Sequence, residues 1–267
     1  MTNAIPYWHV DAFSDAPFGG NQAAVMVLEE WPSDETLVQI GGENLFAETA
    51  FVVPDSTGAA DWELRWCTPT YEIALCGHAT LASGHILLTR DGGERITFRT
   101  RKSGILEVRK GGEMYEVGLP TISTSARDNP EAAALIGGVP AATYRSGEEQ
   151  IGYTLFEFEN EAAIRALTPD LKALGQMGVD QFICTAPGDN TDIVSRVFVP
   201  GAGVDEDSVT GSAHAVLTPH WARKLGRDTF TAYQASERGG HLNLRLEGDR
   251  AWLGGPCVTV VEGTFYL

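Results

Sequence analysis

Two stretches of the sequence share one pattern, and this pattern decides how the chain is organised. Arg65-Trp66-Cys67-Thr68-Pro69 and Arg196-Val197-Phe198-Val199-Pro200 both read Arg-x-x-x-Pro. A short loop follows each of them and leads to small residues that can start a helix, Cys76-Gly77-His78-Ala79 and Thr210-Gly211-Ser212-Ala213. Matches in the same order indicate an internal duplication. We expect a duplicated α/β unit to place two helix N-termini in equivalent positions, facing each other across the cleft between two halves.

The size and composition of the chain are those of a folded globular protein. Its 267 residues suit one large domain or two of about 130 residues each. Hydrophobic residues make up 43% of the chain and charged residues 21%, which excludes disordered, collagen-like and coiled-coil classes.

The charge balance is strongly acidic. Lysine and arginine number 19 against 36 aspartates and glutamates, a formal net charge of −17. Because a nucleic-acid groove needs clustered positive charge, we expect no nucleic-acid partner. No apolar run is long enough to cross a membrane and no signal peptide is visible, so we expect a cytoplasmic protein with no membrane partner. The four cysteines are widely spaced, which is typical of isolated thiols in a reducing compartment.

The first half of the chain, residues 1–119, reads as a mixed α/β unit. A helix is expected to begin after Ser33, a good N-cap residue followed by acidic residues, although Gly41-Gly42 weakens the helical pattern. A second helix is expected to open at Gly77 and to end before residues 91–93. Alternation of apolar and polar residues predicts strands over 7–13, 23–28, 49–53, 62–66, 96–100, 105–109 and 114–119.

The second half, residues 120–267, repeats this style. A connector rich in Ser, Thr, Asp, Asn and Pro occupies residues 121–130. Asn160 is expected to cap a helix over 161–167, and a longer helix is expected over 211–225. Strands are predicted over 150–158, 181–185 and 193–199, with further strands toward the C-terminus.

The glycines at the two helix starts are candidate ligand-binding positions. A helix N-terminus presents unpaired N–H groups and a partial positive charge, so two such termini make a site for a carboxylate or an enolate. At Gly77 and Gly211 the missing side chain lets a ligand approach the backbone. The alternative is that both glycines serve only tight strand-to-helix turns.

Two carboxylates are candidates for proton transfer. Glu48 stands at the start of an apolar strand, where partial burial would raise its pKa and make it a proton acceptor near neutral pH. The alternative is a solvated loop residue. Asp207 lies in an acidic run just before the second long helix, where favourable interaction with the helix dipole is the competing explanation.

The start of the first long helix adds two further candidates. His78 can donate or accept a proton near neutral pH, and Cys76 lies where a helix N-terminus would stabilise a thiolate, unless it is a buried and inert thiol. No group of histidines, cysteines and acids has the spacing of a metal site, so none is expected. The chain also has no Walker A motif, no dinucleotide-binding glycine motif and no Gly-x-Ser-x-Gly elbow.

Several of these motifs together resemble one family. The quoted segments are Val10-Asp11-Ala12-Phe13, Gly20-Asn21-Gln22-Ala23-Ala24-Val25, Glu48-Thr49-Ala50-Phe51-Val52, Thr68-Pro69 with Glu72, Cys76-Gly77-His78-Ala79-Thr80-Leu81-Ala82, Ser195-Arg196 with Phe198 and Pro200, and Glu206-Asp207 with Thr210-Gly211-Ser212-Ala213. In this order they resemble the PhzF family, the phenazine-biosynthesis-type proteins that share the diaminopimelate epimerase fold. The resemblance implies two pseudo-symmetric α/β halves, each a curled sheet around a central helix, with the active site in the cleft between them.

The resemblance also implies roles for individual residues. The proton-transferring glutamate of the family maps onto Glu48, its histidine after glycine onto His78 and its aspartate before Thr-Gly-Ser onto Asp207. The substrate-binding residues implied in the same way are Gly77, Gly211, Ser212, Asn21 and Cys76. In the phenazine enzyme this implies isomerisation without a cofactor, in which a proton moves between carbons of a small amino-acid-like cyclic diene. Family membership further implies a homodimer and a small carboxylate-bearing substrate.

The sequence departs from the family pattern in two places. The family commonly has Asn-Leu-Ser directly before its glutamate, whereas Leu45-Phe46-Ala47 stands here and Asn44 comes one residue early. Cys76 occupies the place of one of the two catalytic thiols of diaminopimelate epimerase-like enzymes, but the matching residue in the second half is Thr210. Because a threonine hydroxyl cannot act as a thiolate base near neutral pH, racemisation by two thiols is disfavoured.

The leading hypothesis is therefore a cofactor-independent isomerase of the PhzF type with Glu48 as its acid/base group. The first alternative is a one-thiol epimerase that uses Cys76 opposite Glu48 or Asp207. The second is a small-acid binding protein that has the fold and no chemistry, because a fold does not by itself fix a function.

Overall fold

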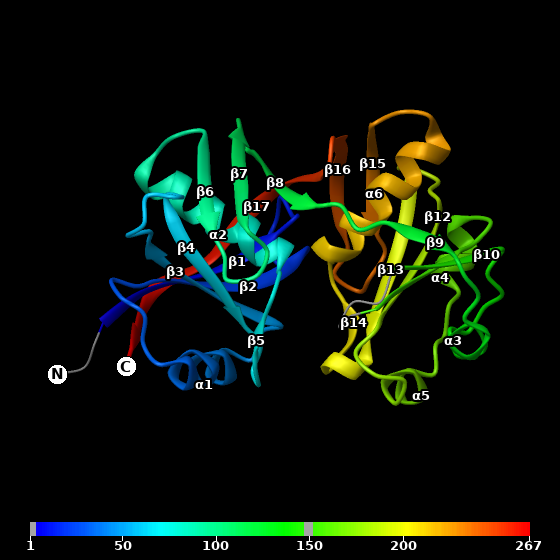
Figure 1. Ribbon diagram of the computed structural model, residues 1–267, viewed down its shortest axis with the longest axis horizontal. Coiled ribbons are helices and arrows are strands. Elements are labelled where there is room, and N and C mark those ends of the chain that lie inside the picture. Colours follow the sequence, from blue (N-terminus) through cyan, green and yellow to red (C-terminus); the bar gives the residue numbers. More distant parts are fainter. Residues whose placement is uncertain (1–3, 147–151) are drawn as a thin grey trace. The chain divides into compact units, whose positions relative to one another are not determined.

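The computed structural model describes residues 4–146 and 152–267, and it contains two compact units (Figure 1). Unit 1 comprises Met1–Leu119 and Leu253–Leu267, and unit 2 comprises Pro120–Trp252. The sequence places the last segment in the second half. It belongs to unit 1 because its strand pairs antiparallel with the first strand of the chain from Ala4↔Tyr266 to Ala12↔Cys257.

Unit 1 is a curled sheet around one long helix. The strands pair in the circular order β1, β2, β3, β4, β6, β7, β8, β17 and back to β1, and β5 is a short addition beside β4. The bounds are β1 Ala4–Ala12, β2 Asn21–Val27, α1 Asp34–Asn44, β3 Glu48–Pro54, β4 Trp62–Cys67, β5 Glu72–Ile73, α2 Gly77–Asp91, β6 Arg95–Arg99, β7 Ile105–Gly111, β8 Met114–Pro120 and β17 Arg250–Tyr266.

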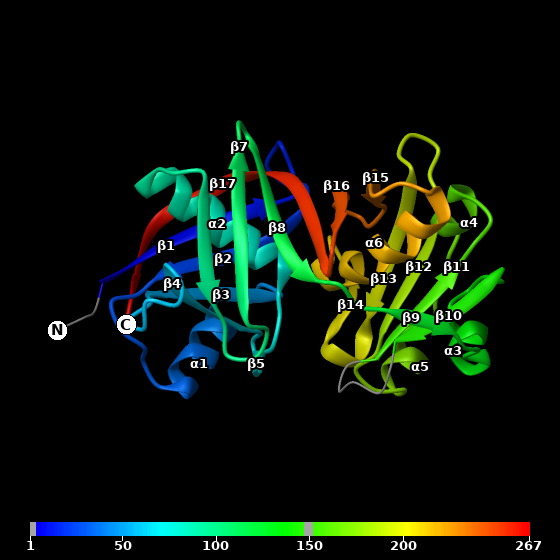
Figure 2. The same cartoon turned by 45° about the horizontal axis from the view of Figure 1, so that its top comes forward.

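Helix α2 fills the inside of this curl, where it contacts β1, β2, β3, β6 and β7 (Figure 2). Most of its residues are small or aliphatic, and most are buried. The hydroxyl groups of Thr80 and Ser83 donate to carbonyls one turn earlier, so these two buried hydroxyls are satisfied within the helix. At Gly84 an added Cβ would lie 2.4 Å from a Val108 methyl, so only glycine lets the helix pack this closely on β7.

Helix α1 covers the outer face of the unit 1 sheet. Ser33 caps it by accepting from the backbone N–H of Thr36, as the sequence predicts. Leu37 and Ile40 are fully or almost fully buried and belong to the same apolar cluster as Phe51 of β3. The glycine pair that weakens the helical pattern has a packing reason, because the backbone at Gly41 lies against the Thr68 carbonyl.

Unit 2 also combines one sheet with one long helix. Its strands pair in the order β9, β10, β11, β12, β13, β15, β16, with β14 beside β13. Helix α6 contacts β16, while α4 packs on β12 and β13. The bounds are β9 Thr124–Ala126, α3 Pro130–Leu135, β10 Ala142–Ser146, β11 Tyr153–Glu157, α4 Glu161–Arg165, α5 Leu171–Gly175, β12 Gln181–Pro187, β13 Ile193–Val199, β14 Val204–Asp207, α6 Gly211–Leu225, β15 Thr229–Gln234 and β16 Gly240–Glu247, with a 3₁₀ turn at Pro200–Ala202.

The strand registers confirm the internal duplication. Thr49 of β3 pairs with Cys67, and Phe182 of β12 pairs with Phe198. Cys67 and Phe198 each stand two residues after the arginine of the repeated motif. On this register Glu48 of unit 1 corresponds to Gln181 of unit 2.

The sequence predicts the two long helices closely and misses the short elements. Helix α6 has the predicted bounds, and Asn160 caps α4 by accepting from the Ala163 N–H. The predicted connector over 121–130 holds β9, and α3, α5, β5, β10 and β14 are not anticipated. Of the strand predicted over 150–158, residues 150 and 151 lie outside the described residues, and β11 covers Tyr153–Glu157.

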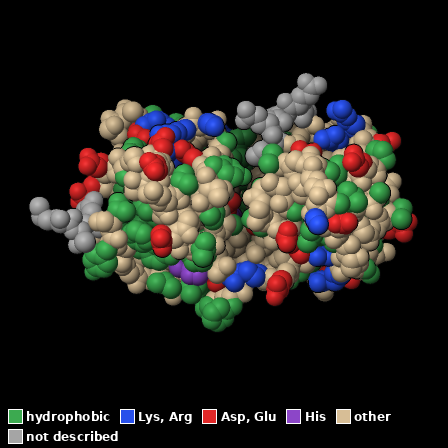
Figure 3. Space-filling view, turned by 90° about the horizontal axis from the view of Figure 1, so that it is seen from below, with side chains coloured by type: hydrophobic (Ala, Val, Ile, Leu, Met, Phe, Trp, Pro, Cys, Tyr) green, Lys and Arg blue, Asp and Glu red, His purple; other side chains and the backbone are tan. Residues whose placement is uncertain are grey.

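The surface carries its charge in mixed groups. On the face drawn in Figure 3, Lys and Arg side chains form small groups beside Asp and Glu. Paired examples include Arg90 with Asp91 and Arg95 with Glu107. Within the described ranges, none of the α-helices has both the length and the hydropathy that a membrane span requires.

The glycine pair of α1 supplies a matched stability test. A Cβ at position 41 would lie 2.7 Å from the Thr68 carbonyl oxygen, whereas a Cβ at position 42 would have its nearest contact at 3.5 Å. We expect Gly41→Ala to lower the free energy of unfolding by about 1–3 kcal/mol through overpacking. Gly42→Ala should raise it by up to about 1 kcal/mol, because alanine favours the helix. Urea unfolding of both variants measures this, and equal effects would contradict the packing argument.

Candidate functional site

Glu48 is placed by the beginning of strand β3. This strand runs parallel to β2, with Ala23 opposite Glu48, and its following residues are buried. The turn before it is fixed by Asn44, whose side-chain N–H donates to the Thr49 hydroxyl at 3.0 Å. Leu45 ends α1 in the left-handed conformation with φ 56°, which is uncommon for a leucine. The carboxylate therefore stands at the edge of the core with its side chain 18% exposed.

Cys76 and His78 are placed by the start of helix α2. Cys76 is the N-cap residue in an extended conformation, and its side chain makes no capping hydrogen bond to the helix. Gly77 and His78 form the first turn, and both are buried. Because the thiol does not cap the helix, it can point toward the imidazole.

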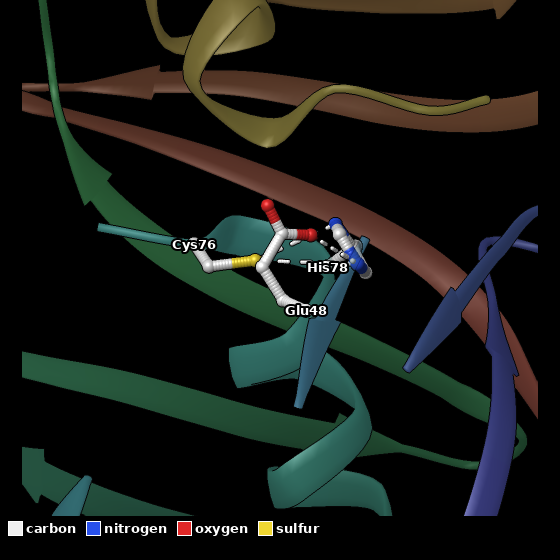
Figure 4. Close-up of side chains that lie close together, drawn as sticks. All are labelled: Glu48, Cys76 and His78. Atoms are coloured by element: carbon white, nitrogen blue, oxygen red, sulfur yellow. Dashed lines mark hydrogen bonds and ion pairs between the residues drawn. The ribbon is translucent and has the colours of Figure 1, made fainter. Parts of the chain in front are cut away.

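The three side chains converge on one another (Figure 4). The Glu48 carboxylate lies 3.3 Å from Nε2 of His78, an ion-pair distance when the imidazole is charged. The Cys76 sulfur lies 3.5 Å from Nδ1 and 4.0 Å from Nε2 of the same ring. The sequence predicts each of these residues as a candidate, and the structure brings them together. The spacing of the three residues in the sequence does not predict this convergence, because β3 and α2 are separate in the chain.

Asn21 contacts one ring nitrogen of His78. Its side-chain nitrogen lies 3.1 Å from Nδ1 in a buried contact. An amide nitrogen can only donate, so with the amide in this orientation Nδ1 accepts and a neutral ring carries its proton on Nε2. That proton faces the Glu48 carboxylate. Asn21 is thus a contact of His78 in this structure, which gives it a positioning role beside the substrate-binding role implied by the resemblance.

An arginine holds the segment that leads to α2. Nε and Nη2 of Arg65 donate to the two carboxylate oxygens of Glu72 at 2.9 and 2.6 Å. The Arg65 side chain is buried, and Nη2 also donates to Asp34 at 2.7 Å. A two-pronged contact of this kind fixes both groups geometrically. It ties β5, and with it the loop before Cys76, to strand β4.

Unit 2 repeats this support with other residues at the helix start. Nε and Nη2 of Arg196 donate to Glu206 of β14 at 2.8 and 2.9 Å. Gln234 accepts from the Thr210 N–H and donates to the Asp207 carbonyl, which fixes the start of α6. Asp207 is the last residue of β14, so it stands close before the helix in sequence as predicted.

Gln181 is a residue that the sequence analysis misses. It forms hydrogen bonds with the hydroxyl of Ser212, with distances of 3.0 and 3.1 Å. By strand register Gln181 corresponds to Glu48, and by helix position Ser212 corresponds to His78. A comparison of the two halves in register would have revealed it. The start of α2 in unit 1 thus lies beside the titratable pair of Glu48 and His78. The start of α6 in unit 2 lies beside the neutral pair of Gln181 and Ser212.

The remaining thiols differ from Cys76 in their environment. Burial raises the pKa of Cys67 to about 11 and that of Cys257 to about 12, and it raises the pKa of Cys184 still further. These thiols therefore stay protonated near neutral pH. All four cysteines are free, in agreement with the predicted isolated thiols.

Comparisons with known proteins identify the family of the chain. A family described as phenazine biosynthesis-like protein, PhzC-PhzF, matches residues 10–263. The chain belongs to this family. An uncharacterized isomerase of Pseudomonas aeruginosa is 41% identical over 265 residues, which cover 98% of this chain and 99% of the relative.

Solved structures of the PhzF family share the architecture. A PhzF-family protein of Enterococcus faecalis matches with a TM-score of 0.90 and 39% identity over 99% of this chain and 100% of that one. A predicted epimerase of Pseudomonas aeruginosa matches with a TM-score of 0.74 and 17% identity over 98% and 99% of the two chains, which shows a common fold. The chain thus has the fold of PhzF proteins and epimerases, and it is an enzyme of the isomerase class, as its relative is named.

Helix α6 of this PhzF-family chain contains a buried histidine that generates a pH prediction. Burial lowers the pKa of His214 to about 4, even though Nδ1 donates to the Thr210 carbonyl. The unfolded state therefore binds more protons than the folded state between about pH 6.5 and pH 4. We expect stability to fall as the pH drops through this window, by about 3 kcal/mol for this residue.

Denaturant unfolding at several pH values between 4 and 7 tests this prediction. The variant His214→Gln should show a shallower loss of unfolding free energy with falling pH. The exposed His241 provides the control, and His241→Gln should keep the slope of the parent protein. Parallel slopes for the parent and His214→Gln would contradict the assignment.

Proposed function

We propose that this chain is a cofactor-independent isomerase that moves a proton between carbons of a small carboxylate-bearing, amino-acid-like substrate, with Glu48 as the group that takes and returns the proton. The observation that carries the proposal is the contact between the partly exposed Glu48 carboxylate and the buried His78 imidazole at 3.3 Å. A carboxylate suits this task because one group can accept a proton from one carbon and deliver it to another.

The two members of this pair have different access to a substrate. The Glu48 side chain is 18% exposed, and that of His78 is 4% exposed. The carboxylate is therefore the group that can reach a carbon acid, and the imidazole orients it. A ring fixed by Asn21 with its proton on Nε2 stabilises the ionised carboxylate, which is the form that accepts a proton.

The helix starts supply the second requirement of the reaction. Removal of a proton beside a carboxylate leaves negative charge on the substrate, and N–H groups at a helix N-terminus stabilise such charge. Gly77 at the start of α2 has no side chain, which lets a ligand approach its backbone closely. Asp207, Gly211 and Ser212 keep in this proposal the roles that the family resemblance implies.

One observation favours a second enzymatic candidate. The Cys76 sulfur lies 3.5 Å from Nδ1 of His78, and a thiol beside an imidazole can be activated as a base. This geometry supports a one-thiol epimerase in which Cys76 abstracts the proton. A two-thiol racemase has no support, because the residue at the start of α6 is Thr210.

Deuterium exchange separates the two candidates. The protein is incubated in D₂O with a panel of cyclic and unsaturated amino acids and other small carboxylates, and proton NMR follows the loss of C–H signals. For a substrate found in this way, we expect Glu48→Gln to lower the exchange rate by about 10²–10⁴-fold, since this range is typical of a lost general acid/base. Cys76→Ser should keep most of the activity.

The control variant carries the same change of glutamate to glutamine at another position. Glu43→Gln alters an exposed carboxylate of α1 and should leave exchange unchanged. An active Glu48→Gln variant together with an inactive Cys76→Ser variant would favour the epimerase. Binding of a carboxylate without exchange by the parent protein would instead favour a binding protein that has no chemistry.

The proposal also covers the cellular location, the oligomeric state and the partners of the enzyme. We place it in the cytoplasm as a homodimer, without nucleic-acid, membrane or cofactor partners, as the charge balance and the resemblance to the PhzF family lead us to expect. Light scattering tests the oligomeric state, because a monomer mass across the working concentration range would refute the homodimer.

A further inference from the structure

Glu48, Cys76 and His78 together form a set of metal-binding donors. One ligand atom from each of them, a carboxylate oxygen, a sulfur and an imidazole nitrogen, fits in a group whose members all lie within 4.8 Å of one another. The sequence spacing gives no sign of this, since metal motifs in sequence rely on ligands that are close in the chain. Figure 4 shows the sulfur and the carboxylate directed toward the imidazole ring.

The distances suit a tetrahedral ion. With metal bonds of about 2.0 Å to nitrogen and oxygen, two tetrahedral ligands stand about 3.3 Å apart. The Glu48 oxygen and Nε2 of His78 are separated by 3.3 Å. A sulfur ligand with a bond of about 2.3 Å should stand about 3.5 Å from the nitrogen. The observed separation from Nε2 is 4.0 Å, and the sulfur lies closer to Nδ1, at 3.5 Å, so binding at Nε2 requires the Cys76 side chain to rotate toward that nitrogen.

The chemistry of the donors selects the kind of metal. Thiolate and imidazole ligands favour zinc and other thiophilic divalent ions, whereas magnesium and calcium prefer sets made only of oxygen. Three protein ligands with the fourth position open are the arrangement of catalytic rather than structural zinc sites. The partial exposure of Glu48 leaves a path for the ion.

The surroundings of His78 provide the support that a metal-bound imidazole needs. A ligating histidine usually gives its other ring proton to a fixed acceptor, which orients the ring. With the metal on Nε2, the ring proton moves to Nδ1, 3.1 Å from the buried amide of Asn21. Turned over about its terminal bond, this amide presents its oxygen and accepts that proton.

We propose that Glu48, Cys76 and His78 bind a thiophilic divalent cation such as Zn²⁺, and that the bound ion blocks proton transfer. The thiol of Cys76 releases its proton to solvent as the metal–sulfur bond forms, and no redox change takes place. The ion occupies the carboxylate lone pairs that would accept the substrate proton. The blocking rests on the proposed function, whereas the binding itself does not.

Cobalt titration tests the binding without any substrate. Co²⁺ is added under anaerobic conditions to the chelator-treated full-length protein, and a thiolate-to-cobalt charge-transfer band is followed in the near ultraviolet. We expect one equivalent of Co²⁺ per chain to give this band and Zn²⁺ to remove it by displacement. Cys76→Ser should abolish the band, and Glu48→Gln should weaken binding at least tenfold. Asn21→Ala should weaken it about 10–100-fold, as is typical for a lost orienting partner.

The matched control is Cys257→Ala, which removes another thiol of unit 1 whose pKa burial raises to about 12. This variant should keep the cobalt band, and thermal melts without metal establish that each variant is folded. No band in the parent protein at saturating Co²⁺, or a band that survives Cys76→Ser, would overturn the site. A band insensitive to Glu48→Gln would overturn the three-ligand assignment.

A separate measurement addresses the blocking. For any substrate found by deuterium exchange, Zn²⁺ should suppress the exchange of the parent protein and a chelator should restore it. A metal-loaded enzyme that exchanges at the full rate would refute the blocking and leave the binding result intact. If no substrate exchanges, the cobalt titration still decides whether the site exists, so the two proposals fail separately.

Discussion

The paired contact between an arginine and a glutamate is the constraint on which both helix starts depend. Arg65 with Glu72 and Arg196 with Glu206 use the same two guanidinium nitrogens and tie a short strand to a longer one. A buried pair of this kind adds little net stability, because both charges lose their hydration, but it fixes geometry and is costly to break on one side. The segments that follow, Ile73-Ala74-Leu75 and Asp207-Ser208-Val209, are equal in length and deliver each helix start at the same place in its unit.

On this repeated scaffold the chemistry has become asymmetric. Position by position, unit 1 has Glu48, Cys76 and His78 where unit 2 has Gln181, Thr210 and Ser212. Each replacement exchanges an ionisable side chain for one that stays neutral. The duplicated architecture is thus compatible with several reactions, since the backbone of the helix start does not specify the side chains beside it. The three ionisable side chains of this comparison lie in unit 1.

The parts of the fold that the sequence predicts are those governed by local chemistry. Ser33 and Asn160 are recognised as caps because their short polar side chains satisfy free N–H groups, and the long helices are recognised from Gly77 and Gly211. The short elements are missed because tertiary pairing, and not local preference, creates strands such as β9 and β14. The return of the last strand to unit 1 depends on its partner β1, which no local pattern encodes.

In the candidate site, too, the sequence predicts what depends on residue type and misses what depends on tertiary packing. Glu48, His78 and Cys76 can be singled out by residue type and by resemblance, but their mutual distances depend on how β3 and α2 are packed. The contacts of Asn21 with His78 and of Gln181 with Ser212 join residues far apart in the chain, so a single sequence gives no signal for either pairing. Alignment of the two units by their strand register identifies Gln181 as the counterpart of Glu48.

The shared contacts of His78 explain why one small cluster supports two proposals. A group that carries a proton to carbon must be reachable and must be held with its lone pair free, and these are also the requirements for binding a metal ion. Under the two proposals, the Asn21 amide selects between these states through the position of the ring proton of His78. When its nitrogen faces Nδ1, the proton of His78 stays on Nε2 beside Glu48. If its oxygen faced Nδ1, Nε2 would present its lone pair to a cation, so under the two proposals the orientation of one buried amide would couple proton transfer to metal binding.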